Sequence, residues 1–309
     1  MLDFQPVTIG SREVIQQYMM SYGGGSCQHS FVSSFCLYGK YGDMFCEHEG
    51  SLYVLRSKKC CGNERVYLFP MGDVSGVKSA VDNVLNDAHE NNSLVKFETV
   101  TESAKDIITN LFPGKFSVEY SRDLSEYVYR TEHQVNLPGH ELATKRKNIH
   151  KFFRDYDGRC SITRITPEHI EGIRTFQREW LASKLLSEYD LQHDLQLEQE
   201  NDGIQTALDN FFALGLSGIV LFIDGSIKGY AYGAPLSEKV FDAIVEKGDK
   251  NIPNIYRVLN REFSRLCCEG YEYINREEDL GIEGLRTTKT RYKPEYMIEK
   301  FILNEHIRS

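Results

Sequence analysis

The residues of this chain that are best suited to chemistry lie near its C-terminal end, where a polar run is followed by evenly spaced cations. The polar run is Asn275-Arg276-Glu277-Glu278-Asp279, and the cations are Arg286, Lys289 and Lys293. Spacings of three and four would put these cations along one face of a helix. Cations beside carboxylates can bind an anionic substrate and hold a proton-transfer group. The same charges could instead form a solvated face with salt bridges, which is the commoner arrangement.

The elements expected around these residues would place them at the edge of a sheet. Tyr271–Ile274 has the composition of a short strand, and the polar run after it has that of a loop. A helical pattern starts at Leu285 and ends before Pro294, and Met297–Leu303 is again typical of a strand. Ligands in α/β sheets usually bind at the carboxyl ends of strands. The sequence therefore predicts a ligand site at this loop.

Composition limits the class of protein. The chain has 309 residues, 41% of them hydrophobic, which suits two domains of ordinary size. Its formal net charge of −9 argues against a dedicated sequence-independent nucleic-acid binder, although one local basic groove stays open. We see no secretory signal, no apolar run long enough to span a membrane and no CxxC pair among the eight cysteines. We expect a cytoplasmic protein with reduced cysteines.

The order of the predicted elements repeats along the chain. The first half is predicted as helix, four strands, helix, strand, helix, strand, and the second as strand, helix, helix, three strands, helix, strand, helix, strand. We therefore predict two copies of one α/β module, residues 1–135 and 136–309, each a mixed sheet flanked by helices. A single irregular α+β fold is the alternative. The predicted elements include strands at 30–38 and 218–222 and helices at 11–20, 167–186 and 203–214.

Three motifs carry a resemblance to a known family. The pattern G-L-R-x-x-K-x-x-Y-x-P, from Gly284 to Pro294, resembles the closing motif of the catalytic domain of phosphatidylglycerol lysyltransferases. The run from Asn275 to Gly281 is similar to soluble relatives of that domain, and Lys145–Phe152 resembles their K-R-x-x-x-x-x-F segment. The resemblance implies a tandem GNAT-like fold. It also implies similarity to Fem-type peptidyltransferases, which take amino acids from tRNA.

Two features depart from that family pattern. The lysyltransferases carry a membrane-embedded lipid-flipping domain that we do not find, so we expect a small-molecule or peptide acceptor. The CoA-binding GNAT signature Q/R-x-x-G-x-G/A is missing from Glu246–Asn251, and Met71–Gly76 lacks its full form. Glycines and free N–H groups at a helix start are what cradle a pyrophosphate. We therefore expect an aminoacyl-tRNA end rather than acyl-CoA as the donor, and no required cofactor.

Acyl transfer from an ester sets the roles that the predicted catalytic residues would take. The acceptor must lose a proton, the oxyanion must be stabilised and the leaving oxygen must be neutralised. We predict that Lys289, with Arg286, neutralises the leaving ribose oxygen and a nearby phosphate. Asp279 or Glu278 would hold the acceptor amine and help to deprotonate it, and Tyr232 or Tyr292 would donate a hydrogen bond.

A wider set of residues is predicted to bind the substrates. Lys145, Arg146 and Lys151, on one basic helix, would line the path of a tRNA acceptor end. These residues could instead have purely structural roles. The basic helix could present a solvated charged face that binds no substrate, and Asp279 could simply pair with Arg286 to fix the loop. The predicted substrate-binding residues are Asn275, Arg276, Arg286, Tyr232, Lys247, Lys145, Arg146 and Lys151.

Other functions compete with aminoacyl transfer. A CoA-dependent N-acyltransferase and a non-catalytic binding protein could both use this fold. A metal site is not expected, because Cys27, His29, Cys46 and His48 lack a standard zinc spacing. The sequence leaves the donor, the acceptor and the oligomeric state undetermined.

Overall fold

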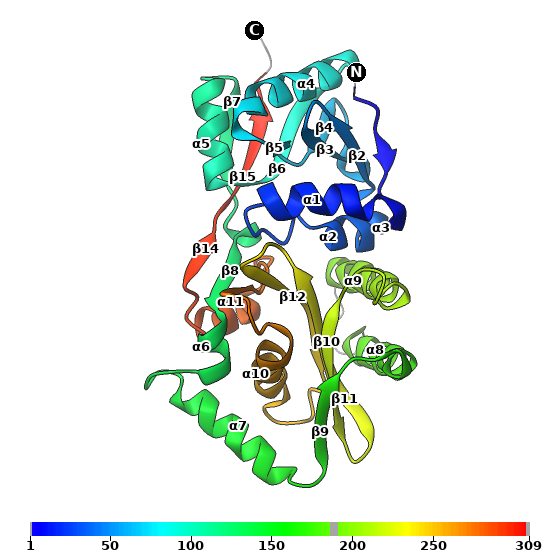
Figure 1. Cartoon of the computed structure of the whole chain (residues 1–309), viewed down its shortest axis with the longest axis vertical. Helices are drawn as coiled ribbons and strands as arrows, with labels where there is room; N and C mark the ends of the chain where they lie inside the picture. Colours follow the sequence, from blue (N-terminus) through cyan, green and yellow to red (C-terminus); the bar gives the residue numbers. More distant parts are fainter. Residues whose placement is uncertain (1, 186–190, 307–309) are drawn as a thin grey trace. The chain divides into compact units, whose positions relative to one another are not determined.

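The computed structural model describes residues 2–185 and 191–306. These residues divide into two compact units. Each unit is built on a β-sheet that is flanked by helices, which confirms the predicted mixed α/β fold class (Figure 1).

Each unit is assembled from segments that are far apart in the sequence. Unit 1 combines the chain up to Tyr127 with Glu277–Thr287 and the stretch that starts at Tyr296. Unit 2 combines Val128–Arg276 with Thr288–Glu295. The predicted boundary at residue 136 differs from this division, because the last strand of the chain pairs inside the sheet of unit 1.

The sheet of unit 1 takes its strands from both ends of the chain. Its order is β1-β2-β3-β4-β6-β15-β7, with β5 beside β3. The strand β15 lies antiparallel to both β6 and β7, so a C-terminal strand fills the gap between two N-terminal ones (Figure 1). The bounds are β1 Gln5–Pro6, β2 Asp43–His48, β3 Ser51–Arg56, β4 Glu64–Tyr67, β5 Met71–Gly72, β6 Leu94–Thr101, β7 Phe116–Tyr120 and β15 Lys300–Glu305.

The core of unit 1 lies between this sheet and its amphipathic helices. The helix α4 buries Val77, Val81 and Val84, which are spaced along one face, against sheet residues such as Phe97 and Leu303. The helices of this unit are α1 Arg12–Tyr22, α2 Phe31–Cys36, α3 Tyr38–Tyr41, α4 Val77–Glu90 and α5 Glu102–Leu111.

The sheet of unit 2 is a continuous run of strands with one parallel pairing. From β8 its order is β8-β13-β12-β11-β10-β9, and only β12 and β13 run parallel within this series. The parallel pair aligns the end of β13 with Asp242 of β12, so the polar loop leaves the middle of the sheet. The bounds are β8 Glu126–Arg130, β9 Cys160–Arg164, β10 Ser217–Ile223, β11 Ser226–Pro235, β12 Val240–Gly248 and β13 Tyr273–Asn275.

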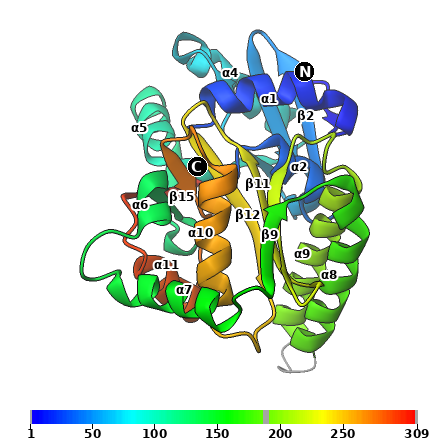
Figure 2. The ribbon, with the colours of Figure 1, turned by 60° about the horizontal axis from the view of Figure 1, so that its bottom comes forward.

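Helices cover both faces of the unit 2 sheet. Figures 1 and 2 show α10 on one face and α8 with α9 on the other. The glycines agree with this arrangement, because a Cβ at Gly229 would meet Leu259 of α10 and one at Gly172 of α8 would meet Ile227. The helices are α6 Thr131–Asn136, α7 Ala143–Asp155, α8 Ile170–Leu185, α9 Leu191–Asp209 and α10 Ile255–Cys267. The helix α11, Glu283–Thr290, and the strand β14, Tyr296–Ile298, lie where the chain passes between the units.

Three predicted elements were wrong in type or extent. The predicted strand at 30–38 is helical, as α2 and the start of α3, because the burial of Phe31 and Val32 on one side outweighs their β propensity. The predicted single strand Met297–Leu303 is two strands, β14 and β15. The helix predicted at 203–214 begins earlier, at Leu191, as α9. The predicted end of the 167–186 helix, Leu186, lies outside the described residues.

Candidate functional site

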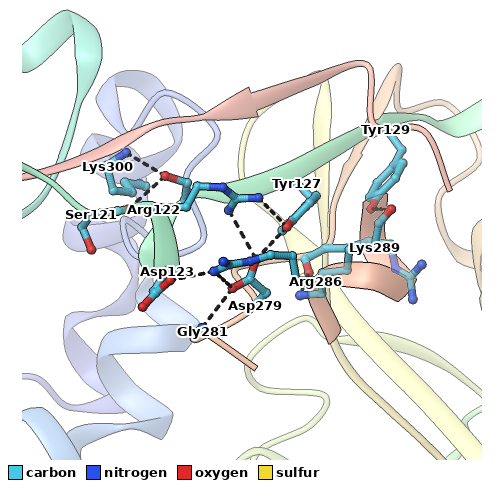
Figure 3. A network of polar contacts seen from close by, with 12 residues as sticks. Ser121, Arg122, Asp123, Tyr127, Tyr129, Asp279, Gly281, Arg286, Lys289 and Lys300 are labelled. Atoms are coloured by element: carbon cyan, nitrogen blue, oxygen red, sulfur yellow. Dashed lines mark hydrogen bonds and ion pairs between the residues drawn. The ribbon is translucent and has the colours of Figure 1, made fainter. Parts of the chain in front are cut away.

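Asp279 lies at the centre of a polar network in unit 1. Its side chain is fully buried, and both carboxylate oxygens accept hydrogen bonds. The donors converge on it from three segments of the chain (Figure 3). They are Arg286 Nε at 3.0 Å and Nη2 at 2.8 Å, Tyr127 Oη at 2.6 Å, the Gly281 amide at 2.9 Å and Arg122 Nη1 at 3.3 Å.

This network fixes the polar loop and leaves Asp279 poorly suited to accept a proton. Burial raises the pKa of Asp279, but hydrogen bonds from Arg286, Tyr127 and the Gly281 amide outweigh it and hold that pKa well below its ordinary range. Gly281 has a φ of +76°, and a Cβ there would lie 2.9 Å from a carboxylate oxygen of Asp123. The geometry matches the alternative in which Asp279 pairs with Arg286 to fix the loop.

Replacing Asp279 by asparagine is expected to destabilise the protein by about 1–3 kcal/mol at neutral pH, since buried charge-assisted hydrogen bonds are lost. The native pKa of Asp279 is depressed, so its stabilisation is complete above the unfolded carboxyl pKa of about 3.9 and is lost as the pH falls further. Urea unfolding of both proteins at pH 7 and in acid measures the difference. A gap in stability that is the same at both pH values would contradict this account.

Glu278 lies in the same unit but contacts a different segment. Its carboxylate accepts a hydrogen bond from Gln28 Nε2 at 3.2 Å and a weak one from the Cys27 thiol at 3.5 Å. Gln28 in turn accepts a hydrogen bond from the buried Arg56 at 3.1 Å. The predicted catalytic carboxylate at Glu278 is therefore oriented by the loop that follows α1.

A buried ion pair contacts residues of that loop. Lys300 Nζ on β15 lies 2.7 Å from Glu126 Oε1 of β8, and both side chains are fully buried. Ser26 donates to the same oxygen at 2.8 Å, and the Cys27 amide donates to Glu126 Oε2 at 3.1 Å. Lys300 thus neutralises a carboxylate that organises the residues next to Gln28.

A second polar group forms in unit 2 where β13 ends. Arg276 Nη2 lies 3.1 Å from Glu246 Oε2 of β12, and both side chains are largely buried. The guanidinium carbon of Arg276 lies 5.3 Å from the ring centre of Tyr292 and 5.9 Å from that of Tyr129. Burial raises the pKa of Glu246, although Arg276 and Lys289 act in the opposite direction. The pKa of Glu246 is thus shifted upwards, whereas that of Asp279 is shifted downwards, and Glu246 is therefore the better suited of the two to accept a proton.

Lys289 is held against the same group by two contacts. Its Nζ donates to the carbonyl oxygen of Arg276 at 2.6 Å, and its own carbonyl accepts from Tyr129 Oη at 2.8 Å (Figure 3). The structure therefore brings Lys289, Arg276 and the buried Tyr292 together. The predicted row of three cations is not formed, because α11 ends at Thr290 and Lys293 lies beyond it.

Further cations gather beside Tyr292. The Nζ of Lys145 on α7 lies 4.5 Å from the Tyr292 ring centre and donates to the carbonyl oxygen of Arg291 at 2.7 Å. Burial lowers the pKa of Lys145, and the positive charges of Arg257, Arg291 and Lys293 lower it further. We call Lys145, Arg257, Arg291 and Lys293 the cation cluster. An anion bound among these four side chains would relieve their mutual repulsion.

Several predicted binding residues lie outside this group. Lys247 is buried, and its ammonium lies 2.8 Å from both carboxylate oxygens of Glu200 and 4.1 Å from the Trp180 ring centre. Arg146 donates to the carbonyl oxygens of Leu137 and Gly139, so it fixes the turn before α7 instead of facing a substrate.

Two more predicted binding residues are interior and a third is exposed. Tyr232 is buried beside Phe211 and Tyr230 in the core of unit 2. Asn275 is fully buried within β13. Lys151 is exposed on α7.

Sequence reasoning missed Glu246 of the unit 2 group and Arg257 and Arg291 of the cation cluster. Glu246 stands on β12, a strand of mainly buried residues that also carries Asp242, and carboxylates within such a strand are a signal that could have been used. Arg257 lies in the first turn of α10, which has no acidic residue.

Within residues 2–185 and 191–306, no three His, Cys, Asp or Glu side chains are grouped so that they could hold a metal ion. None of the helices in that part of the chain has the length and apolar character needed to cross a bilayer.

Comparisons with known proteins place these sites in a wider context. The family model for phosphatidylglycerol lysyltransferase, C-terminal, matches residues 24–304. A conserved protein of unknown function from Bacteroides thetaiotaomicron is 28% identical with a TM-score of 0.91, and the match covers 99% of this chain and 100% of that one. An uncharacterized protein of Mycoplasmoides gallisepticum, MYCGA3080, is 20% identical over 192 residues, or 62% of this chain. The match spans 59% of the length of that curated relative.

Two more distant solved structures share the fold. L-PGS from Bacillus licheniformis has a TM-score of 0.68 at 17% identity, with 96% of this chain and 92% of that chain covered. FemX has a TM-score of 0.63 at 9% identity, with 99% of this chain and 98% of that chain covered. The likenesses run over nearly the whole chain and confirm the predicted tandem fold.

Proposed function

The chain belongs to the family of phosphatidylglycerol lysyltransferase C-terminal domains, and from this premise we propose that it transfers an aminoacyl group from aminoacyl-tRNA to an amine or hydroxyl acceptor. The likeness in fold to L-PGS and FemX supports this class of reaction. The donor ester would be the bond between the amino acid and the terminal ribose of the tRNA.

The cation cluster is the observation that carries the proposal. Lys145, Arg257, Arg291 and Lys293 gather beside Tyr292 closely enough to lower the pKa of Lys145. Lys293 has an acidic partner, Glu141 at 3.1 Å, but both side chains are more than half exposed, so this pair neutralises little. The terminal nucleotides of a tRNA would bring phosphates to such a cluster, and the ring of Tyr292 lies near both Lys145 of the cluster and Arg276.

The reaction assigns a role to each member of the unit 2 group. The acceptor nitrogen or oxygen attacks the ester carbonyl, the carbon–oxygen bond to ribose breaks, and the ribose oxygen leaves as an alcohol. Glu246, whose pKa is raised by burial, takes the proton from the acceptor and passes it to the ribose oxygen, which therefore leaves as an alcohol. Lys289 stabilises the negative charge on the oxyanion and the leaving oxygen. Asp279 and Arg286 act by fixing the loop that leads into α11.

Replacing Lys145 by alanine tests the donor site. The KM for aminoacyl-tRNA is expected to rise by about 10–100-fold, the cost of one charge-assisted hydrogen bond of about 1.5–3 kcal/mol, with a smaller change in kcat. Lys145→Arg keeps the charge and should restore much of the affinity. The measurement is transfer of a labelled amino acid from tRNA to amine and hydroxyl acceptors, with acetyl-CoA as a competing donor.

The outcomes of this assay separate the candidate functions. Transfer from tRNA that weakens in Lys145→Ala and recovers in Lys145→Arg supports the proposal. Transfer from acetyl-CoA alone, or an unchanged KM for tRNA in Lys145→Ala, would overturn it. The exposed Lys239, in the same unit, provides the matched control as Lys239→Ala.

A further inference from the structure

The outer face of α7 is basic from Lys147 to Arg154, with the exposed Thr144 and Asp155 at its two ends. Every exposed residue from Lys147 to Arg154 is basic, and the four are Lys147, His150, Lys151 and Arg154. Their spacings of three, one and three place them on one stripe, which we call the α7 stripe. The apolar side chains Ile149 and Phe152 lie on the opposite side and are buried.

An ordinary solvated helix face does not account for this stripe. Such faces usually mix charges of both signs. The helix α8 in the same unit does so, since Arg178 lies 3.7 Å from Glu171. On the α7 stripe, the only ion pair within the described part of the chain is Arg154 with Asp155, at 3.7 Å and largely exposed. A chain with net charge −9 has thus concentrated positive charge on one surface.

We propose that the α7 stripe binds the phosphate backbone of the base-paired acceptor stem of the tRNA donor. This inference rests on the proposed function, and it concerns the stem instead of the aminoacyl end. The same helix carries Lys145, which belongs to the cation cluster, so α7 would contact both parts of one RNA. The stripe spans the eight residues from Lys147 to Arg154, or about 10 Å along the helix, which is enough to contact more than one phosphate.

The surface suits a nucleic acid better than a membrane. A helix that lies on a bilayer buries an apolar face among the lipids. No large hydrophobic side chain of α7 is exposed, and its half-buried Phe153 lies 5.4 Å from the Arg261 guanidinium. The recognition expected is therefore electrostatic and independent of base sequence.

The test uses the full chain with Lys147 and Lys151 both replaced by alanine, and Lys239→Ala with Lys250→Ala as the matched control. Binding to an RNA hairpin that has a single-stranded 3′ end and carries no amino acid is measured between 50 and 200 mM salt. Two lost phosphate contacts should reduce the slope of log K against log salt by about 1.5. The control pair, which is exposed but lies off the stripe, should leave the slope unchanged.

A second measurement separates this inference from the proposed function. Transfer is compared from whole aminoacyl-tRNA and from a short aminoacylated oligonucleotide that lacks the stem. The stripe variant should raise the KM for whole tRNA several-fold and leave the KM for the short donor unchanged. Three results would each overturn the proposal that the α7 stripe binds the acceptor stem. They are an unchanged salt slope in the stripe variant, an equal rise in KM with both donors, and tighter binding to anionic vesicles than to the hairpin. If the wild-type protein transfers the amino acid from neither donor, the proposed transferase activity is wrong. The hairpin measurement then still decides whether the α7 stripe binds RNA.

Discussion

Replacing Lys289 by methionine is expected to lower the rate of aminoacyl transfer by about 10²–10³-fold, the effect of removing one preorganised donor to a developing oxyanion. Its Nζ is held 2.6 Å from the Arg276 carbonyl oxygen, so the ammonium is already positioned before substrate arrives. The loss should fall mainly on kcat, because the charge matters most in the transition state. Steady-state kinetics with a labelled aminoacyl-tRNA provide the measurement.

Stability serves as the control for this change. Methionine keeps most of the aliphatic length, and the lost hydrogen bond should cost only about 1 kcal/mol. Lys239→Met, which alters an exposed cation that has no role in the proposed site, should keep kcat near that of the wild type. If Lys289→Met unfolds the protein while activity per folded molecule is retained, the lysine is structural and the catalytic assignment is wrong.

Replacing Lys300 by methionine is expected to destabilise the protein by about 3–5 kcal/mol, because the fully buried carboxylate of Glu126 would lose its counter-charge. Ser26 and the Cys27 amide would still contact that carboxylate, but they cannot neutralise it. Denaturant unfolding, followed by a probe in unit 1, measures the change. Replacing both partners, as Lys300→Met with Glu126→Leu, should recover much of the loss.

A surface pair provides the comparison for Lys300. Lys78 and Asp82 on α4 lie 2.8 Å apart with both side chains well exposed, so Lys78→Met should cost less than about 1 kcal/mol. Equal effects of Lys300→Met and Lys78→Met would show that the buried pair contributes no more than a surface pair does.

Local features of the sequence were enough to predict much of the fold. The helix predicted at 11–20 forms as α1, which runs from Arg12 to Tyr22 and ends at the cap residue Gly23, and Asp73 caps the turn that precedes α4. The three strands after Gly215 follow from their apolar runs and the turn at Asp224-Gly225. These signals act within a few residues, so a single sequence displays them.

The candidate site could be predicted only in part, because its assembly depends on long-range pairing. Arg286 and Lys289 are three residues apart on one helix, yet the first belongs to unit 1 with Asp279 and the second to unit 2 with Arg276. The helical periodicity places both residues on one face of the helix and gives no sign that they belong to different units. Glu246 was missed because it joins Arg276 across 30 residues.

The place of β15 in the first sheet has a consequence for how the protein is made. The strands β6 and β7 are synthesised before the unit 2 segments, but Lys300–Glu305, which lies between them in the sheet, is synthesised after those segments. The N-terminal sheet cannot close until then, and its open edges must wait through the synthesis of some 180 residues between β7 and β15. The sheet of unit 1 is therefore completed only after the segments of unit 2 have been synthesised, when β15 pairs with β6 and β7.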